Sequence, residues 1–267
     1  MPILQLILVA VIQGVTEFLP ISSSGHLILL PSLSGMHDQG QVIDVAVHVG
    51  TLGAVILYFY KDVGLALSGL PRLVRGRIDT RGAQLAFLLA VATVPVMIVG
   101  LFLHETGFSD SLRSVVVIGW TMLIFGVVLH VADRMGGNQK TDRDWSVRDA
   151  ILMGLAQAIA LIPGTSRSGI TITAARWLNY GREDAARLSM LMSIPTIMAS
   201  GLLLGLEVAM DTDLAVARDA AIGAGFAFVS ALLALTLMMR LLKSVSFAPY
   251  VIYRILLGGI LLAYAYS

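Results

Sequence analysis

Six apolar runs, each about 18–22 residues long and so long enough to cross a bilayer, constrain the fold of this chain more than any other feature. We predict six transmembrane helices, over residues 42–60, 83–103, 115–133, 187–206, 220–241 and 249–266. The composition agrees, because hydrophobic residues make up 57% of the chain and charged residues only 13%. A soluble domain would carry about 25% charged residues.

Two further apolar segments, residues 1–30 and 150–182, are each interrupted midway by proline, glycine and serine. We expect each to enter the membrane as a broken helix and turn back, because irregular backbone at that depth is tolerated only beside protein or a wet cavity. Residues 1–30 are not expected to be a signal peptide, since no basic residue precedes Lys61. The predicted fold is an all-α integral membrane protein with six transmembrane helices plus two re-entrant broken-helix segments.

The distribution of lysine and arginine predicts which connections face the cytoplasm. Four connections are rich in these residues: 61–82, 134–148, 176–187 and 240–243. The remaining connections carry one basic residue or none: 31–41, 104–114 and 207–219. The first group should therefore be cytoplasmic and both termini should lie outside. The first broken segment then opens outward and the second opens inward.

The two broken segments resemble each other in sequence. Each opens with a glutamine, Gln13 or Gln157, and reaches a glycine twelve residues later, after a proline and a hydroxyl cluster. Because three predicted spans follow each segment, the two copies would be oriented oppositely, as in inverted-repeat membrane proteins. We predict a single membrane domain, residues 1–267, with inverted repeat halves of roughly 1–135 and 145–267. Their broken helices should meet near the midplane.

The first broken segment places acid, amide, hydroxyl and imidazole groups where lipid is expected. A carboxylate such as Glu17 costs about 2.5–3.5 kcal/mol at a helix centre on insertion scales, so it needs a cation, a proton or a guanidinium partner. Gln13 lies one helical turn earlier, and an amide oxygen and a carboxylate so placed can share a divalent cation. The segment continues with Ser22, Ser23, Ser24 and His26.

The second broken segment has the features of an anion site. Glycine lets the backbone approach a ligand closely, and hydroxyl and N–H groups at a helix start bind anions. The guanidinium of arginine is always charged and can bind phosphate through two N–H groups at once. Arg167 in an apolar stretch also calls for a phosphate or carboxylate partner. The candidate substrate-binding residues here are Gly164, Thr165, Ser166, Ser168 and Thr171, beside Ser22 and Ser24 of the first segment.

The residues leave the chemical mechanism open. Ser23 could attack phosphorus with His26 as its base, His26 could itself attack or act as general acid, or His26 could activate a water. The hydroxyls could instead only cap helix starts, and Glu17 could pair with Arg167 for structure alone. We take Glu17, Ser23, His26 and Arg167 as the catalytic candidates. His48, in the span 42–60, is interpreted as a packing residue.

Two other classes of protein compete with a phosphatase. A polyprenyl-phosphate transporter or flippase would also place broken helices at the midplane. Release of inorganic phosphate separates the two, because a carrier releases none. The phosphatidic-acid-phosphatase superfamily shares a short Ser-Gly-His motif, but its Lys-x6-Arg-Pro and His-x3-Asp motifs do not occur here.

The two motifs together resemble a known family. Gln13-x-x-x-Glu17 followed by Phe-Leu-Pro and Ser-Ser-x-Gly-His, with Pro-Gly-x-Ser-Arg-Ser later, is similar to bacterial undecaprenyl-diphosphate phosphatases of the BacA/UppP type. The resemblance covers the whole chain in length and hydropathy. It implies hydrolysis of undecaprenyl diphosphate to undecaprenyl phosphate and inorganic phosphate. That reaction recycles the lipid carrier for peptidoglycan synthesis, cell wall biogenesis and cell shape, and implies antibiotic resistance towards bacitracin.

The resemblance also implies roles for individual residues. The acidic pair of the family corresponds to Gln13 and Glu17, its motif serine to Ser23, and its histidine to His26. Its second motif corresponds to Ser166, Arg167 and Thr171. Gln13 stands where many members carry glutamate, and one fewer negative charge would weaken metal binding there.

A cofactor and partners follow from the same resemblance. The implied cofactor is a divalent cation, Mg²⁺ or Ca²⁺, held by Gln13 and Glu17. The implied partners are the lipid substrate undecaprenyl diphosphate and the bilayer of the bacterial plasma (inner) membrane, with the active site facing the periplasm. No nucleic acid partner is expected, because the chain has no basic cluster. The sequence leaves open whether the protein forms a homo-oligomer.

Overall fold

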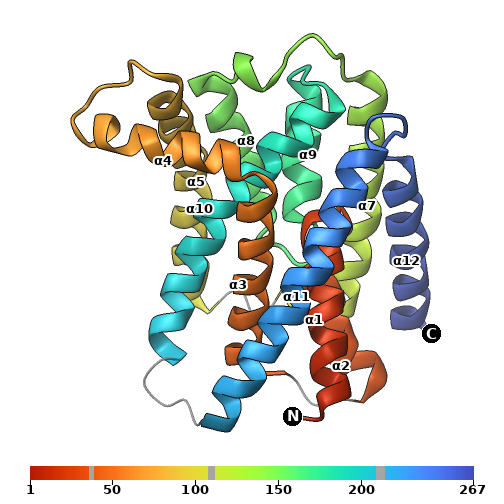
Figure 1. Cartoon of the computed structure of the whole chain (residues 1–267). Coiled ribbons are helices and arrows are strands. Elements are labelled where there is room, and N and C mark those ends of the chain that lie inside the picture. The colour runs from red at the N-terminus through yellow and green to blue at the C-terminus, as the bar shows by residue number, and fades with distance from the viewer. Residues whose placement is uncertain (36–38, 108–111, 209–213) are drawn as a thin grey trace.

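The computed structural model is a bundle of helices and describes residues 1–35, 39–107, 112–208 and 214–267 (Figure 1). Within these ranges the chain forms α-helices and one short 3₁₀ turn, with no β-strand. The helices of the first half are α1 (Ile3–Phe18), α2 (Ser23–Ser34), α3 (Gln41–Tyr58), α4 (Tyr60–Val74), α5 (Arg81–Thr106) and α7 (Val115–Met135). Those of the second half are α8 (Val147–Ile159), α9 (Arg167–Trp177), α10 (Arg182–Val208), α11 (Leu214–Leu241) and α12 (Ala248–Tyr266).

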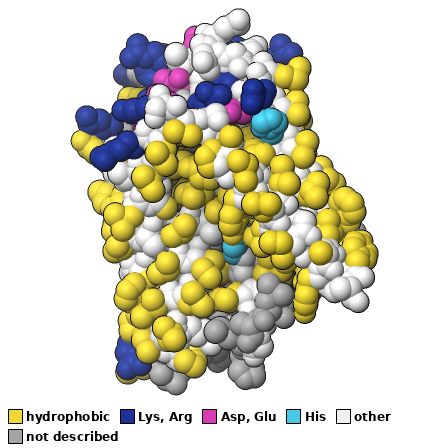
Figure 2. Space-filling model, turned by 90° about the vertical axis from the view of Figure 1, so that its right-hand side faces the viewer, with side chains coloured by type: hydrophobic (Ala, Val, Ile, Leu, Met, Phe, Trp, Pro, Cys, Tyr) yellow, Lys and Arg dark blue, Asp and Glu magenta, His cyan; other side chains and the backbone are white. Residues whose placement is uncertain are grey.

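Six of the described helices are long and apolar enough to cross a membrane: α3, α5, α7, α10, α11 and α12. They confirm the six predicted spans and lie roughly along one axis in Figure 1. Figure 2 shows apolar side chains covering the middle of the bundle and lysine and arginine gathered toward one end. This distribution suits a protein whose middle faces lipid and whose basic end faces an aqueous compartment.

Several boundaries differ from the sequence prediction, and α11, for example, begins at Leu214 rather than at residue 220. Helix α10 begins at Arg182 rather than at residue 187, because its first turn holds Glu183 and Asp184. Acidic residues are stabilised at a helix start but carry no hydropathy signal. The segment 61–82, expected to be a connection, contains α4 and the start of α5.

The two broken segments form two helix hairpins at opposite ends of the bundle. Figure 1 shows α1 running inward from the N-terminal end and α2 returning toward it, whereas α8 and α9 form the second hairpin at the other end. Ser22 and Ser166 begin the returning helices with nearly equal φ angles, 73° and 72°. Each side chain accepts a hydrogen bond from a backbone N–H three residues later, that of Gly25 or Gly169. The re-entry of these hairpins into a bilayer stays a prediction.

Each hairpin packs against a spanning helix of the other half. Helix α1 packs along α11, and α8 packs along α5. Both contacts are close because of a glycine: an added Cβ would lie 2.6 Å from the Ala227 oxygen at Gly14 and 2.5 Å from the Ala92 oxygen at Gly154. Two inverted halves, about 1–135 and 145–267, would produce this packing of each hairpin against a helix of the other half. The division of the chain into these halves stays a prediction.

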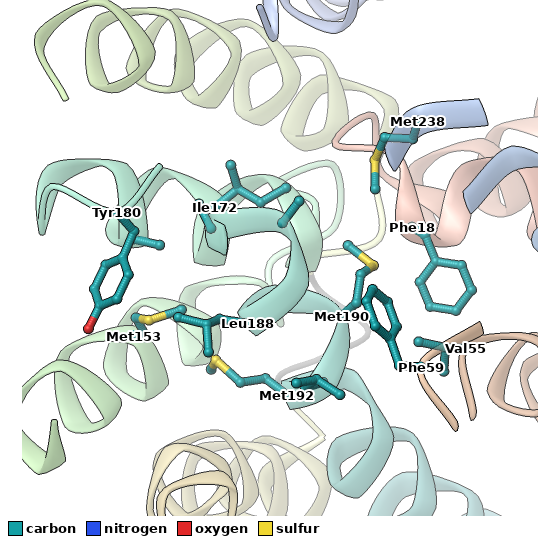
Figure 3. Packing of buried hydrophobic residues seen from close by; sticks show 14 of the residues in the cluster. Phe18, Val55, Phe59, Met153, Ile172, Tyr180, Leu188, Met190, Met192 and Met238 are labelled. Atoms are coloured by element: carbon teal, nitrogen blue, oxygen red, sulfur yellow. The ribbon is translucent and has the colours of Figure 1, made fainter. Parts of the chain in front are cut away.

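Buried apolar side chains support the inner end of α1. In Figure 3, Phe18 lies beside Phe59 and Met190, which come from the end of α3 and from α10. Phe18 and Met190 are fully buried. Since Glu17 and Ser189 are the chain neighbours of these two residues, the packing fixes the backbone that carries both polar groups.

Candidate active site

The carboxylate of Glu17 lies where the two hairpins meet. It is only 8% exposed. Its Oε1 accepts a hydrogen bond from Arg167 Nη2 at 2.9 Å. Its Oε2 accepts hydrogen bonds from Ser23 Oγ at 2.7 Å and from Gln13 Nε2 at 3.0 Å. The structure thus brings together four of the candidate residues, and the pair with Arg167 offsets the cost of burying the acid.

Arg167 is the first residue of α9 and is held from two further sides. Its Nη1 donates to the Ser189 carbonyl oxygen at 3.1 Å. Its guanidinium lies 6.0 Å from the centre of the Phe18 ring. Thr171 Oγ1 donates to the Arg167 carbonyl oxygen and lies 2.6 Å from Ser189 Oγ. Helix α10 therefore positions the guanidinium, and Ser189 is a contributor that sequence reasoning did not identify.

The remaining hydroxyls surround the two helix starts. Ser22 and Ser166 serve as helix caps, as the capping explanation anticipated. Ser168 Oγ donates to the Leu19 carbonyl oxygen at 3.0 Å, which ties the second hairpin to the first. Thr165 Oγ1 is buried without a hydrogen-bond partner among the described residues. Ser24 is exposed, and its Oγ lies 3.4 Å from that of Ser22.

Gly164 sits in the turn before α9 with φ +86°, a conformation that favours glycine. An added Cβ would lie 2.2 Å from Thr121 Oγ1 and 2.8 Å from the Ile118 oxygen. We therefore expect Gly164→Ala to lower the free energy of unfolding by about 1–3 kcal/mol or more. The measurement is the thermal unfolding midpoint in detergent. Gly259→Ala is the matched control, because nothing lies within 4 Å of its Cβ position. Equal midpoints for the two variants would contradict this account of the turn.

The imidazole of His26 is held by Ser22 and by Tyr253. Its Nδ1 is 2.6 Å from the Ser22 carbonyl oxygen and its Nε2 is 2.6 Å from Tyr253 Oη. The two rings are also stacked, with centroids 5.7 Å apart. Both ring nitrogens are therefore engaged, by α2 itself and by α12, and Glu17 is not among the partners recorded for His26.

Among the described residues, the imidazole that pairs with Glu17 is that of His48 on α3. Its Nε2 lies 3.9 Å from Glu17 Oε2, and its Nδ1 is 2.7 Å from the Asp44 carbonyl oxygen. The interpretation of His48 as a packing residue is therefore wrong, because its side chain is 37% exposed and faces the carboxylate. The sequence offered no signal beyond an imidazole in an apolar run.

Arg254 on α12 is a buried arginine at the site that sequence reasoning missed. It is 0% exposed and donates hydrogen bonds to four backbone carbonyl oxygens. These belong to Pro20, Thr121, Met122 and Gly164. Since Pro20 and Gly164 lie in the two turns, this one guanidinium holds both helix breaks in place. The lone arginine inside the apolar run 249–266 was the available signal.

The residues at the site fit a divalent cation in part. No group of three or more His, Cys, Asp or Glu side chains could hold a metal ion in the described part of the chain. However, Gln13 Oε1 is buried beside Glu17 without a hydrogen-bond partner. One carboxylate and one amide oxygen suit Mg²⁺, which is commonly bound by one or two protein ligands together with substrate phosphates.

Arginine and helix starts both bind phosphate groups. An acid–arginine pair between two hydroxyl-rich helix starts therefore indicates a multi-pass membrane protein that acts on phosphate groups. The sequence profile of the family described as "Bacitracin resistance protein BacA" matches residues 6–260. The chain therefore belongs to the BacA family.

Individual relatives agree with this assignment over at least 96% of their length. The chain is 70% identical to a protein of Dinoroseobacter shibae and 68% identical to one of Jannaschia sp., each over 100% of both chains. It is 46% identical to a protein of Rhodospirillum rubrum, over 100% of this chain and 96% of the relative. The first two are named undecaprenyl-diphosphatase and the third undecaprenyl-diphosphatase 1. These names describe phosphatases and do not support the transporter alternative.

Proposed function

We propose that this protein hydrolyses undecaprenyl diphosphate to undecaprenyl phosphate and inorganic phosphate. The observation that carries the proposal is the Glu17–Arg167 pair that joins two hydroxyl-capped helix starts inside a membrane bundle. Family membership supports the same reaction, with its role in recycling the lipid carrier of the cell wall and in bacitracin resistance. Release of inorganic phosphate by the purified protein tests the proposal, and binding of the lipid without release would overturn it.

Binding of the diphosphate would use the second hairpin. Arg167 Nη1 and Nη2 are engaged by Ser189 and Glu17, so a phosphate oxygen would take the place of one of these acceptors. The starts of α2 and α9 add the positive ends of two helix dipoles. A guanidinium and two helix starts directed at the terminal phosphoryl group would stabilise the charge that builds in the transition state.

Attack on phosphorus would come from Ser23. Its hydroxyl already donates to Glu17 Oε2, which can accept the proton. A bond would form between Ser23 Oγ and the terminal phosphorus while the bridging P–O bond breaks, and undecaprenyl phosphate would leave. A water would then hydrolyse the phosphoserine, releasing inorganic phosphate and restoring the hydroxyl. His26 is less suited to this role because both of its ring nitrogens are engaged.

Ser23→Ala should lower kcat on the order of a hundredfold or more with little change in KM, because it removes the attacking atom. The assay is phosphate release by purified protein at saturating lipid. Ser244→Ala is the control, since this exposed hydroxyl lies in the connection after α11 and outside the candidate site, and it should stay within a few-fold of wild type. Unchanged kcat in Ser23→Ala would assign the attack to water or to His26.

A divalent cation, Mg²⁺ or Ca²⁺, would be held by Glu17 and by the unpartnered oxygen of Gln13. When bound, such a cation neutralises charge on the phosphate oxygens. The protein residues would orient the diphosphate against it and keep the carboxylate fixed between Ser23 and Arg167.

Gln13→Glu should reduce the cation concentration that gives half-maximal phosphate release, by several-fold, because a second carboxylate binds a hard cation more tightly than an amide does. Gln13→Leu should shift it in the opposite direction. The measurement is a cation titration of activity after treatment with chelator. Identical titration curves for the two variants would remove Gln13 from the cation site.

The proposed location is the bacterial inner membrane. The basic end of the bundle would face the cytoplasm under the positive-inside rule. The α1–α2 hairpin lies at the opposite end, so it would open toward the periplasm. The undecaprenyl tail would lie along the apolar outer surface of the spanning helices.

A further inference from the structure

Helix α4 is set apart from the rest of the bundle by its direction. It has 15 residues, too few to cross a bilayer, and follows α3 after a single residue. Figure 1 shows it running across the end of the spanning helices rather than along them. This is the end that carries the α8–α9 hairpin. Because six helices long enough to cross a bilayer end there, we expect a helix in that position to lie at the level of the lipid headgroups.

One face of α4 packs on the bundle and fixes its rotation. Gly69 is buried, and an added Cβ would lie 2.1 Å from the Ala83 nitrogen on α5. Asp62 is also buried and pairs with Arg187 on α10. Positions 62 and 69 lie on one side of the helix, so the opposite side is directed away from the protein.

The outward side of α4 carries an apolar stripe. Val63, Leu67, Leu70 and Val74 follow one another at spacings of four, three and four residues, which places them on one face. Leu67 is 59% exposed, Leu70 is 41% exposed and Val74 is 85% exposed. Val63 is half-buried, and the three exposed apolar side chains in line with it are a feature of an interaction surface rather than of a solvated helix.

A basic face lies on the other flank of the helix. At about 100° per residue, Lys61, Ser68, Arg72 and Arg75 fall together, about 100° from the packed face and on the side away from the apolar stripe. All four are exposed. Arg72 pairs with Asp79, whereas no salt bridge is recorded for Lys61 or Arg75 within the described ranges. The helix therefore has one packed face, one apolar face and one basic face.

We propose that α4 is an interfacial helix that binds anionic phospholipids. Its apolar stripe inserts into the boundary between headgroups and acyl chains, and its basic face binds lipid phosphates beside it. This division into an apolar and a basic face is what an amphipathic helix uses to lie in a membrane surface. Each basic side chain near an anionic surface adds attraction of the kind that enriches such lipids locally.

Site-directed fluorophores can test the position of each face. The chain has no cysteine, so a single introduced thiol carries the only label. Leu67→Cys and Ser68→Cys are adjacent in sequence but about 100° apart on the helix, one in the apolar stripe and one on the basic face. Each labelled protein is placed in lipid nanodiscs. Quenching is then measured with lipids brominated near the headgroup and with aqueous iodide.

The label at position 67 should be quenched mainly by brominated lipid, and the label at position 68 mainly by iodide. Equal iodide quenching at both positions would overturn the proposal, because it would place the stripe in water. Protection of position 67 that persists in detergent and grows with protein concentration would also overturn it, because a second copy would then cover the stripe.

A second arm tests the choice of lipid. With the label at position 67, a brominated anionic lipid should quench at least about threefold more strongly than a brominated zwitterionic lipid at equal mole fraction. The double variant Lys61→Gln/Arg75→Gln should abolish that preference and leave quenching by the zwitterionic lipid unchanged. No preference in the wild-type background would refute anionic lipid binding.

Discussion

Replacing Arg167 with alanine should lower the rate of phosphate release on the order of a hundredfold or more, because it removes the group that offsets transition-state charge. The same change leaves Glu17 buried without its cation partner, which should cost roughly 3–5 kcal/mol of stability. The measurements are kcat at saturating lipid and the thermal unfolding midpoint in detergent.

Arg167→Lys separates the two effects, because it keeps the charge beside Glu17 but loses the fork that contacts Glu17 and Ser189 together. We expect a well-folded protein with a clear loss of kcat. Arg143→Ala, at an exposed position in the connection before α8, is the control for removing an arginine and should be unaffected. An Arg167→Ala protein with near-normal turnover would remove Arg167 from the mechanism.

Arg254→Met should lower the stability by roughly 3–5 kcal/mol, as much as Arg167→Ala, because it removes the buried side-chain donor that four backbone carbonyl oxygens share, including those of Pro20 and Gly164 in the two turns. The loss includes both turns that bring Glu17 and Arg167 together. Activity should fall with it, although Arg254 contacts neither of these two side chains in the structure. Denaturation of the purified protein and phosphate release measure the two effects.

Arg240→Met is the matched control, since it removes an exposed arginine from the last turn of another spanning helix, α11. Its stability should change by less than about 0.5 kcal/mol, as for most surface substitutions. Equal stability of the two variants would show that the buried hydrogen bonds of Arg254 do not hold the turns.

The six spans were predictable because their signal is strong and local. A run of apolar residues long enough to cross a bilayer is typical of a transmembrane helix and of few other structures. Every predicted run overlaps a helix of the structure. The two motifs were also visible, because an acid or an arginine is rare in an apolar segment. Glu17 and Arg167 could therefore be named as candidate partners before the structure placed them 2.9 Å apart.

Contacts to the backbone were not predictable in the same way. Arg254 binds carbonyl oxygens, which every residue carries, so no residue type in the sequence marks its partners. His48 on α3 and Ser189 on α10 contact the site although they are distant from its motifs in sequence. Only the packing of the helices brings them there. Helix α4 was missed because a short amphipathic helix has neither the length nor the hydropathy of a span.

The most direct test of the account is phosphate release from undecaprenyl diphosphate by the purified wild-type protein, measured with Mg²⁺ or Ca²⁺ and again with chelator. We predict release of one inorganic phosphate per lipid diphosphate, lost with chelator and restored by the cation. A well-folded protein that releases no phosphate under either cation would contradict the assignment of this site as a diphosphatase.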